Sequence, residues 1–558
     1  MNNVLSSINA RVSNICSQGK CYHSHNVSVA TVMKGIQELN SGKADGNVGH
    51  STDHLINGSH KLHVYLSVLL QAMLIHGCAP EMLSLSTIVP IPKNKRKCLN
   101  DSDNYRGIAL SNSIGKLFDW VLLLTNKSVF SSSDLQFGYK PKHSTVHCTY
   151  VLNEVVNYFN NRGSDVHVVL LDASKAFDRI NYVKMFKLLL NKGTCPLVAR
   201  FLASLYTSQL VRVKWNDYVT YPFNVSNGVK QGGVLSPILF TLYLDELLNN
   251  LRKSGYGCHI GNVFLGALAY ADDVTLISPS RTATLRMLEI ADKFSKEYDV
   301  LFNHSKSKLL LFRSSSNDLC PFDKKSISFD GSIIECVDNE KHLGNVIGKE
   351  SNANNIKQCI NDFYGRVNVL IANFKFVSPS IRYDLFKTFC MPLYGVQLWD
   401  FSSPFVDRFL VAWRKCIRRL MVLPMQTHCS LLHIICNDFT AEVQLHKRFM
   451  RFIHSIMNSN NECVKLCSKI VMGGSRTQIS DSINHICHLY NIRKDQLMTL
   501  NLHEIMGKIH KCHVSTMSKD DIIKASIIND MLYLRDNLHC TELTSDEIEY
   551  IIDDLCTG

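Results

Sequence analysis

The chain has 558 residues, 46% of them hydrophobic and 19% charged, which is the composition of an ordinary globular protein. Its length exceeds one compact core, so we expect two to four domains. Lys and Arg outnumber Asp and Glu by 60 to 48, and the net charge of +12 suits a polyanionic partner without requiring one. No apolar run approaches the roughly 18–20 residues of a membrane span, and the N-terminus lacks the apolar core of a signal peptide. A membrane-spanning chain is therefore not expected, and a reducing compartment is favoured.

The spacing of apolar residues predicts the secondary structure along the chain. In chain order we expect a helix at 28–40 capped by Ser28, a turn at 42–49, a helix at 60–83, strands at 84–92 and 166–172, helices at 183–206 and 236–252, a strand at 263–270 and a helix at 282–300. From about residue 350 the strand signals fade, and helices are expected at 352–373, 380–395, 405–423 and 440–458. Strands that alternate with helices predict an α+β body at about 30–347, followed by a helical remainder.

Acidic residues stand where three predicted strands begin or end. Asp172 closes one apolar run, and Asp272 and Asp273 form a turn between two others. If that hairpin pairs beside the first strand, carboxylates 100 residues apart meet, and two of them about 4 Å apart repel by roughly 4 kcal/mol at an effective dielectric of 20. Such a group favours bound Mg²⁺, which prefers hard oxygen ligands. Asp is also an ordinary turn residue, so the carboxylates alone leave a structural role open.

Two groups of cysteines and histidines could in principle bind zinc. Neither has the paired C-x-x-C spacing of common zinc modules, so buried or free thiols are the competing interpretation. The two groups are Cys16, Cys21, His23 and His25, and Cys463, Cys467, His485, Cys487 and His488.

Seven sequence blocks occur in the order and spacing of reverse transcriptase motifs. They are IPKNKRK (91–97) with NYRGIAL (104–110), LQFGYKPKHST (135–145), VVLLDASKAFDRINY (168–182), SNGVKQGGVLSPILFTLYLDEL (226–247), LAYADDVTLI (268–277), FNHSKSK (302–308) and KHLGNVI (341–347). The chain resembles the reverse transcriptases of non-LTR, LINE-type retrotransposons of the Jockey-like group. QLWD (397–400) and AWRKCIRRLMVLP (412–424) resemble the thumb of these elements. The segment GKADGNVG departs from the family pattern at Val48, and Gly107 stands where Pro is usual.

The resemblance implies an α+β right-hand polymerase, with fingers and palm built on an antiparallel sheet, a helical thumb and a helical C-terminal region. The expected domains are an N-terminal extension with an early fingers block at 1–72, fingers and palm at 73–347, a thumb at 348–435, and a helical region of unknown role at 436–558.

The resemblance also implies the catalytic residues. Asp172 and Asp272 are expected to bind two Mg²⁺ ions, which Mn²⁺ could replace, with the Ala173 carbonyl as a further ligand. Asp273 is expected to support this site. Lys306 matches the lysine that protonates the leaving pyrophosphate, although Lys308 is close enough in sequence to be confused with it.

Further matched positions are expected to bind the incoming nucleotide. Lys93 and Arg106 match fingers residues that close on the triphosphate, and Gln231 and Gly232 match the loop that holds the new base pair. Phe177 matches the bulky gate beneath the sugar, where a ring would clash with a 2′-hydroxyl and so select deoxynucleotides. A packing role for Phe177 in the palm core is the alternative.

Two basic segments are expected to contact nucleic acid. Lys95 and Arg96 lie in the loop 92–97, for which phosphate contact, nuclear import and a solvated surface are the possible roles. Residues 405–423 form an amphipathic helix whose cationic face would follow a duplex backbone, or would simply be solvated. Its expected contact residues are Arg414, Lys415, Arg418 and Arg419.

The resemblance predicts an RNA-directed DNA polymerase that uses an RNA template, a DNA primer and deoxynucleoside triphosphates. The chain is expected in nucleus and cytoplasm as a ribonucleoprotein, with the endonuclease supplied by a missing segment or another protein. The alternative function is a catalytically inactive or co-opted relic that binds RNA or DNA. A group II intron maturase is a third possibility, for which the helical tail gives no cue.

Overall fold

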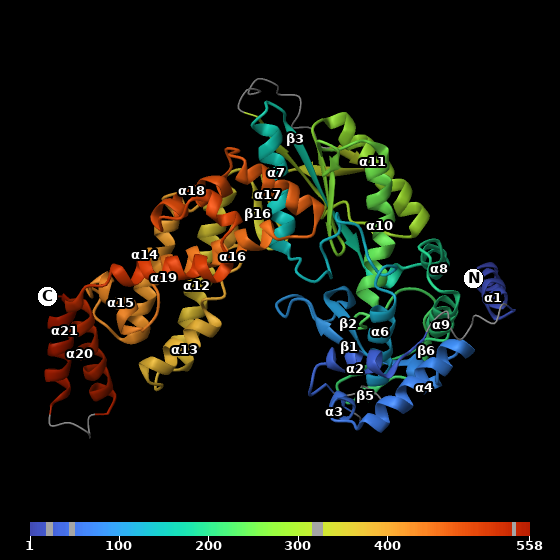
Figure 1. The fold of residues 1–558 in the computed structure, drawn as a ribbon, viewed down its shortest axis with the longest axis horizontal. Helices are drawn as coiled ribbons and strands as arrows, with labels where there is room; N and C mark the ends of the chain where they lie inside the picture. Colours follow the sequence, from blue (N-terminus) through green and yellow to red (C-terminus); the bar gives the residue numbers. More distant parts are fainter. Residues whose placement is uncertain (18–25, 44–48, 50, 315–326, 538–542, 558) are drawn as a thin grey trace.

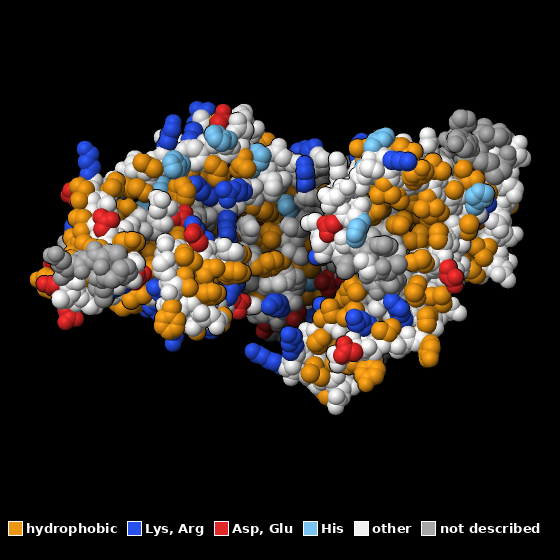
Figure 2. Space-filling model, turned by 90° about the horizontal axis from the view of Figure 1, so that it is seen from below, with side chains coloured by type: hydrophobic (Ala, Val, Ile, Leu, Met, Phe, Trp, Pro, Cys, Tyr) orange, Lys and Arg blue, Asp and Glu red, His pale blue; other side chains and the backbone are white. Residues whose placement is uncertain are grey.

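The computed structural model describes residues 1–17, 26–43, 49, 51–314, 327–537 and 543–557. Two lobes lie along the long axis, with the N-terminus at one end and the C-terminus at the other (Figure 1). Both larger sheets belong to the N-terminal lobe, and the C-terminal lobe is helical. The face in Figure 2 is hollowed between the lobes, and Lys and Arg side chains gather beside the hollow over the helical lobe. Within the described ranges, no helix is long and apolar enough to cross a lipid bilayer.

The larger sheet has seven strands and is mostly antiparallel. Its order is β13-β14-β12-β3-β10-β9, and β11 also pairs with β3. The strands are β3 (Val166–Ser174), β9 (Ala267–Tyr270), β10 (Asp273–Ser278), β11 (Leu301–Phe302), β12 (Lys308–Phe312), β13 (Ile327–Phe329) and β14 (Ser332–Cys336). The first six residues of β3 are all buried, which is why that stretch of the sequence is a continuous apolar run. The strand expected at 166–172 is confirmed, and it lies inside the sheet between β12 and β10.

Helices cover the larger sheet on either side. On one side lies α7 (Thr145–Asn160), and on the other lie α10 (Ser236–Ser254) and α11 (Arg281–Tyr298) (Figure 1). The expected helices at 236–252 and 282–300 are thereby confirmed to within two residues at either end. Two short hairpins belong to the same lobe. Their strands are β7 (His259–Ile260) with β8 (Val263–Phe264), and β15 (Asn339–His342) with β16 (Asn345–Gly348).

The smaller sheet has the order β2-β1-β4-β5, with β6 also on β4. Its strands are β1 (Leu85–Pro92), β2 (Tyr105–Leu110), β4 (Leu210–Trp215), β5 (Tyr218–Val219) and β6 (Phe223–Asn224). The remaining helices of this lobe are α1 (Asn2–Ser17), α2 (Val29–Gln37), α3 (Thr52–Ile56), α4 (His60–His76), α5 (Glu81–Ser84), α6 (Ser113–Thr125), α8 (Tyr182–Asn191) and α9 (Pro196–Thr207). Ser28 caps α2 as predicted, because its side chain accepts a hydrogen bond from Thr31 N.

Three expected elements are each divided in two. The helix expected at 60–83 ends at Gly77, which has a φ of +66°, and α5 starts after Pro80. The helix expected at 183–206 is interrupted by Gly193 at φ +83° before Pro196 begins α9. The strand expected at 263–270 breaks at Gly266, whose Cα lies against Gly257 and leaves no room for a side chain. The helix expected at 380–395 ends earlier, at Phe389.

The C-terminal lobe consists of helices, as expected. The first three pack on one another: α12 (Ser351–Asn373), α13 (Pro379–Phe389) and α14 (Phe405–Met421). The others are α15 (Cys429–Ile435), α16 (Ala441–Met457), α17 (Glu462–Met472), α18 (Gln478–Leu489), α19 (Leu502–Ser515), α20 (Lys519–Asp536) and α21 (Ser545–Thr557). Short 3₁₀ helices lie in this lobe at Val396–Leu398 and Lys494–Met498, and in the N-terminal lobe at Ser102–Asn104 and Ala176–Arg179.

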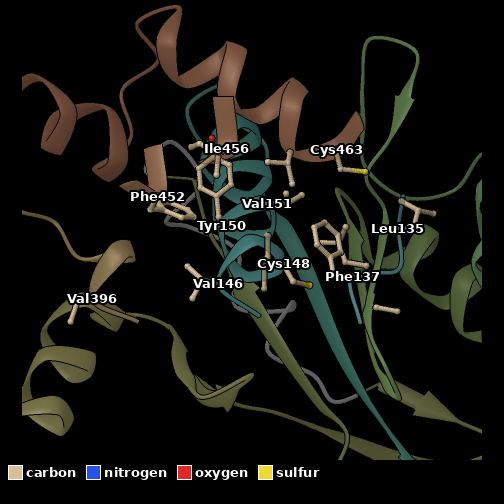
Figure 3. Close-up of a cluster of buried hydrophobic side chains, with 14 of the residues drawn as sticks. Leu135, Phe137, Val146, Cys148, Tyr150, Val151, Val396, Phe452, Ile456 and Cys463 are labelled. Carbon is tan, nitrogen blue, oxygen red and sulfur yellow. The ribbon is translucent and has the colours of Figure 1, made fainter. Parts of the chain in front are cut away.

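The C-terminal region packs directly on the helix that covers the larger sheet. Phe452 of α16 contacts the ring of Tyr150 of α7 at 5.6 Å between ring centres, and both side chains are buried (Figure 3). Asn461 donates a hydrogen bond of 2.8 Å to Asp134 O. The expected domain limits stay a prediction; the one at residue 72 falls inside α4, which is continuous there.

Candidate active site

The Asp272–Asp273 doublet lies at the tip of a hairpin. Tyr270 of β9 pairs with Asp273 of β10, so the turn between them has only two residues. Ala271 adopts a left-handed φ of +57°, an uncommon conformation for a residue with a side chain. The apolar strands on either side force this tight turn, and the turn presents the carboxylates at the end of the sheet.

Asp172 meets this doublet across the sheet. In the antiparallel pairing of β3 with β10, the Cα partner of Asp172 is Asp273. Directly opposed residues of an antiparallel pair place their side chains on the same face, with Cβ atoms about 5 Å apart. The expected convergence of the distant carboxylates is therefore confirmed. Ala173 follows in β3 and pairs with Phe302 of β11.

The electrostatics of the three carboxylates are those of a cation-binding group. Burial raises the pKa of Asp272, the Asp172 charge raises it further, and the Arg106 charge opposes this. Burial and both neighbouring aspartates raise the pKa of Asp273 to about 6. Ionised together, the carboxylates repel one another, and a divalent cation between them would relieve that repulsion. The residues present thus fit a hard metal ion.

The carboxylates do not by themselves form a complete metal site. In the part of the chain that the structure describes, no three His, Cys, Asp or Glu side chains are grouped closely enough to hold a metal ion. Mg²⁺ commonly binds through one or two carboxylates and keeps water or substrate oxygens in its shell. Cys463, Cys467 and the histidines near them are among these described residues and are likewise not grouped to hold a metal ion. In the N-terminal Cys/His group, Cys21, His23 and His25 lie outside the described residues, as does Val48.

Lys306 lies beside the acidic group. Its Nζ is 3.5 Å from Asp172 Oδ2, and its side chain is 66% exposed. Lys308, the residue with which it could be confused, instead forms an ion pair of 2.8 Å with Glu335. Of the two lysines, Lys306 is therefore the one that lies beside Asp172.

The predicted fingers residues lie on the smaller sheet and its loop. Lys93 Nζ donates to Asp103 O at 2.8 Å, while Lys95 and Arg96 are exposed on the same loop. Arg106 of β2 is exposed and near enough to Asp272 to affect its pKa. An exposed ion pair of 2.8 Å between Lys175 and Asp103 links this loop to the segment that follows β3.

Phe177 is held against the helix that follows the Gln231–Gly232 turn. Its ring stacks on Phe240 of α10 at 4.7 Å between centroids and an interplanar angle of 19°. Gln231 donates a hydrogen bond of 3.3 Å to Asp178 Oδ1. Gly232 has a φ of +111°, and a Cβ there would come within 2.8 Å of Ala109 O, so a side chain is excluded at this position.

Two polar residues near the site were not identified from the sequence. Tyr139, with a φ of +56°, lies near both the ring of Phe177 and the charge of Asp272. Asp119 of α6 accepts a hydrogen bond from Leu235 N at 3.3 Å, and burial raises its pKa to about 6. Asp119 could have been found from the sequence, because it is the only acidic residue in the apolar helical segment at 113–125.

The expected cationic face of α14 is smaller than predicted. Lys415 and Arg419 are exposed and Arg414 is half-buried. Arg418 is 8% exposed, and its guanidinium donates two hydrogen bonds to Thr427 O, so its predicted contact with nucleic acid is wrong. The cause is the loop after α14, which folds back over that side of the helix.

The chain is similar to known reverse transcriptases. Residues 91–341 match the family model described as reverse transcriptase (RNA-dependent DNA polymerase). The chain is 24% identical over 381 residues to an RNA-directed DNA polymerase from mobile element jockey of Drosophila melanogaster, which covers 64% of this chain and 40% of that protein. It is 26% identical over 286 residues to a retrovirus-related Pol polyprotein from type-1 retrotransposable element R2 of Popillia japonica, over 50% of this chain and 40% of that one.

A solved structure of telomerase from Candida albicans aligns with 77% of this chain and 66% of that one, at 12% identity and a TM-score of 0.34. The chain spans 40% of the length of the jockey and R2 proteins that it matches.

Proposed function

We propose that the chain is an RNA-directed DNA polymerase of the non-LTR retrotransposon type. Residues 91–341 match a reverse transcriptase family model, and the similarity to the jockey and R2 proteins supports that type. The observation that carries the proposal is the register of β3 with β10, in which Asp172 stands opposite Asp273. With Asp272 in the adjoining turn, three carboxylates from distant parts of the chain share one end of the sheet. The proposed substrates are an RNA template, a DNA primer and deoxynucleoside triphosphates.

Reverse transcriptases as a family depend on metal ions, and we propose two Mg²⁺ ions here, replaceable by Mn²⁺. Asp172, Asp272 and the Ala173 carbonyl would hold them. When bound, such ions activate the primer 3′-hydroxyl and stabilise charge on the departing pyrophosphate. The hydroxyl oxygen forms a bond to the α-phosphorus as the bond to pyrophosphate breaks. Lys306, whose Nζ is 3.5 Å from Asp172, would give the pyrophosphate a proton.

Substrate selection is assigned to residues around this group. Lys93 and Arg106 would bind the triphosphate, with Gln231 and Gly232 against the new base pair and Phe177 beneath the sugar. Lys95 and Arg96 would contact the template strand. Lys415, Arg419 and Arg414 would follow the duplex backbone, in contacts that are sequence-independent and sensitive to salt. Nuclear and cytoplasmic residence as a ribonucleoprotein is part of the same proposal, supported by the basic loop at 92–97.

The test is extension of a labelled DNA primer on an RNA template by the purified chain with Mg²⁺. We expect Asp272→Asn to lower the incorporation rate by roughly 10³-fold or more, a loss of about 4 kcal/mol of transition-state stabilisation. Asp217→Asn, at an exposed turn in the smaller sheet, is the matched control and should extend normally. Salt-dependent RNA binding without any extension by the parent chain would instead support a non-catalytic relic.

A further inference from the structure

The segment Leu135–Gly138 runs alongside the catalytic hairpin. Leu135 O accepts a hydrogen bond of 2.8 Å from Ala269 N, and Phe137 N donates one of 2.7 Å to Ala269 O. Gln136 forms a parallel bridge with Ala269 of β9. This segment is therefore joined to the edge strand β9 by an isolated β-bridge, next to the turn that carries Asp272.

Gln136 makes a two-point contact with that turn. Its side chain is completely buried. The amide nitrogen Nε2 donates a hydrogen bond of 3.1 Å to Ala271 O, and the amide oxygen Oε1 accepts one of 2.9 Å from Ala271 N. The same oxygen accepts a bond of 2.8 Å from Gly138 N. One side chain thus satisfies both backbone groups of the residue immediately before Asp272.

We propose that Gln136 is a positioning residue of the polymerase site, which fixes the Ala271 backbone and through it the direction of the Asp272 carboxylate. The inference rests on the proposed function, because it assigns a role within that reaction. Ala271 is in the left-handed region, which a residue with a side chain occupies only when its surroundings hold it there. A primary amide supplies the required donor and acceptor together, and no other neutral side chain of that length does.

The residues around Gln136 pack closely against the Ala271 turn and restrict its backbone conformation. A Cβ at Gly138 would collide with Ala271 N, so the two backbones are in close contact. On the other side, Leu135 and Phe137 are fully buried in a cluster with Cys148 of α7 and Cys463 of α17 (Figure 3). The main chain of this segment is therefore anchored, so movement of the Ala271 turn would break the bonds to Gln136.

The experiment compares Gln136→Leu with the parent chain in single-nucleotide incorporation on an RNA template. A displacement of about 1 Å at a catalytic group costs up to roughly 100-fold in rate. We expect the maximal incorporation rate to fall by about 10- to 100-fold and the Mg²⁺ concentration for half-maximal rate to rise, because both depend on the Asp272 carboxylate. The KM for deoxynucleotide and the Kd for primer–template should change by less than about 3-fold. A general loss of structure would shift all four quantities.

Gln444→Leu is the matched control. Gln444 of α16 also donates a side-chain hydrogen bond to a backbone carbonyl, Phe439 O at 2.9 Å, but belongs to the helical lobe. Its variant should incorporate nucleotides at the parent rate.

A parental maximal rate and Mg²⁺ requirement in Gln136→Leu would overturn the inference. If that variant does not fold, Gln136→Glu decides instead, since it keeps the length and the acceptor but loses the donor to Ala271 O. The same fall in rate supports the inference and a parental rate overturns it. No extension by the parent chain, with RNA still bound, would count against the proposed function itself, and the positioning role would fail with it.

Discussion

The packing of Phe177 is compatible with both roles that its sequence position left open. Its ring packs on Phe240, which is buried in α10, yet Phe177 itself stays half-buried close to Tyr139. An aromatic ring that is held by stacking on one of its faces cannot easily rotate, so its other side stays in place against a neighbouring group. Packing therefore supports a selective role, because a side chain that could turn away would not exclude a 2′-hydroxyl.

The first prediction at the residue scale concerns sugar selection. Phe177→Val removes the ring and should raise the incorporation of ribonucleotides relative to deoxynucleotides by about 10- to 100-fold, the range for one steric contact. The measurement is the ratio of kcat/KM for a ribonucleotide and the matching deoxynucleotide. Tyr221→Val, at a 94% exposed residue in the loop between β5 and β6, should leave that ratio unchanged. Equal selectivity in the Phe177 variant and the parent would contradict the gate.

The sequence was informative about single residues where local chemistry determines them. Asp272 could be placed in a turn, and Asp273 at its edge, because apolar runs bound them closely on both sides. Gln136 could not be assigned a role, since its partner Ala271 is 135 residues away. Arg418 was misassigned because helical periodicity predicts which side of a helix is polar, but not that Thr427 of the following loop covers it.

At the scale of elements, the sequence predicted most helices and strands but not where long ones divide. Gly77 and Gly193 mark two of the breaks, and both adopt positive φ values. Apolar residues keep their helical spacing on each side of these glycines. A prediction that averages this spacing over about a dozen residues therefore does not detect the turn. The strand at 263–270 divides for a different reason, because Gly266 packs against Gly257, a contact between neighbouring segments that periodicity does not encode.

A buried acid between two elements gives a prediction about stability. Glu154 of α7 is 2% exposed, and burial against the C-terminal helices raises its pKa from 4.5 to about 8, partly opposed by the Thr477 hydroxyl. The unfolded chain loses this proton near pH 4.5 and the folded chain only near pH 8, so the contribution of Glu154 to folding becomes less favourable as pH rises through that window. The slope is at most about 1.4 kcal/mol per pH unit.

The test is the free energy of unfolding of parent and Glu154→Gln chains at pH 5.5 and pH 8. The variant should gain stability relative to the parent as pH rises, by on the order of 1–3 kcal/mol across this interval. Glu549→Gln, at the exposed surface of α21, should give no such change. A difference between parent and Glu154→Gln that does not vary with pH would contradict the burial of an ionisable group here.

For the whole molecule, the main finding beyond the sequence is how the last helices are used. The segment 436–558 was expected to be a separate helical region, because its own pattern contains no strand and no motif. In the fold, α16 and α17 pack against α7, which in turn covers the sheet that carries Asp172. These contacts join residues more than 300 positions apart, such as His147 with Ser455. No local pattern can encode pairs at that separation.

This packing predicts that the N-terminal lobe depends on the C-terminal helices. Removing residues 436–558 would uncover Tyr150, which is completely buried, and would strip the hydrogen bonds from Asn461 and Glu462 to Asp134. Losing the partner of one such buried ring costs roughly 3–5 kcal/mol, a large share of the 5–15 kcal/mol that stabilises a typical domain. We expect the chain ending at residue 435 to be insoluble or to unfold at least about 10 °C below the parent.

A chain lacking only 518–558 keeps α7 covered by α16 and α17, and should retain most of its stability. If the shorter chain unfolded at the parental temperature and extended primers normally, the C-terminal helices would be an independent module resting on the palm rather than part of its structure.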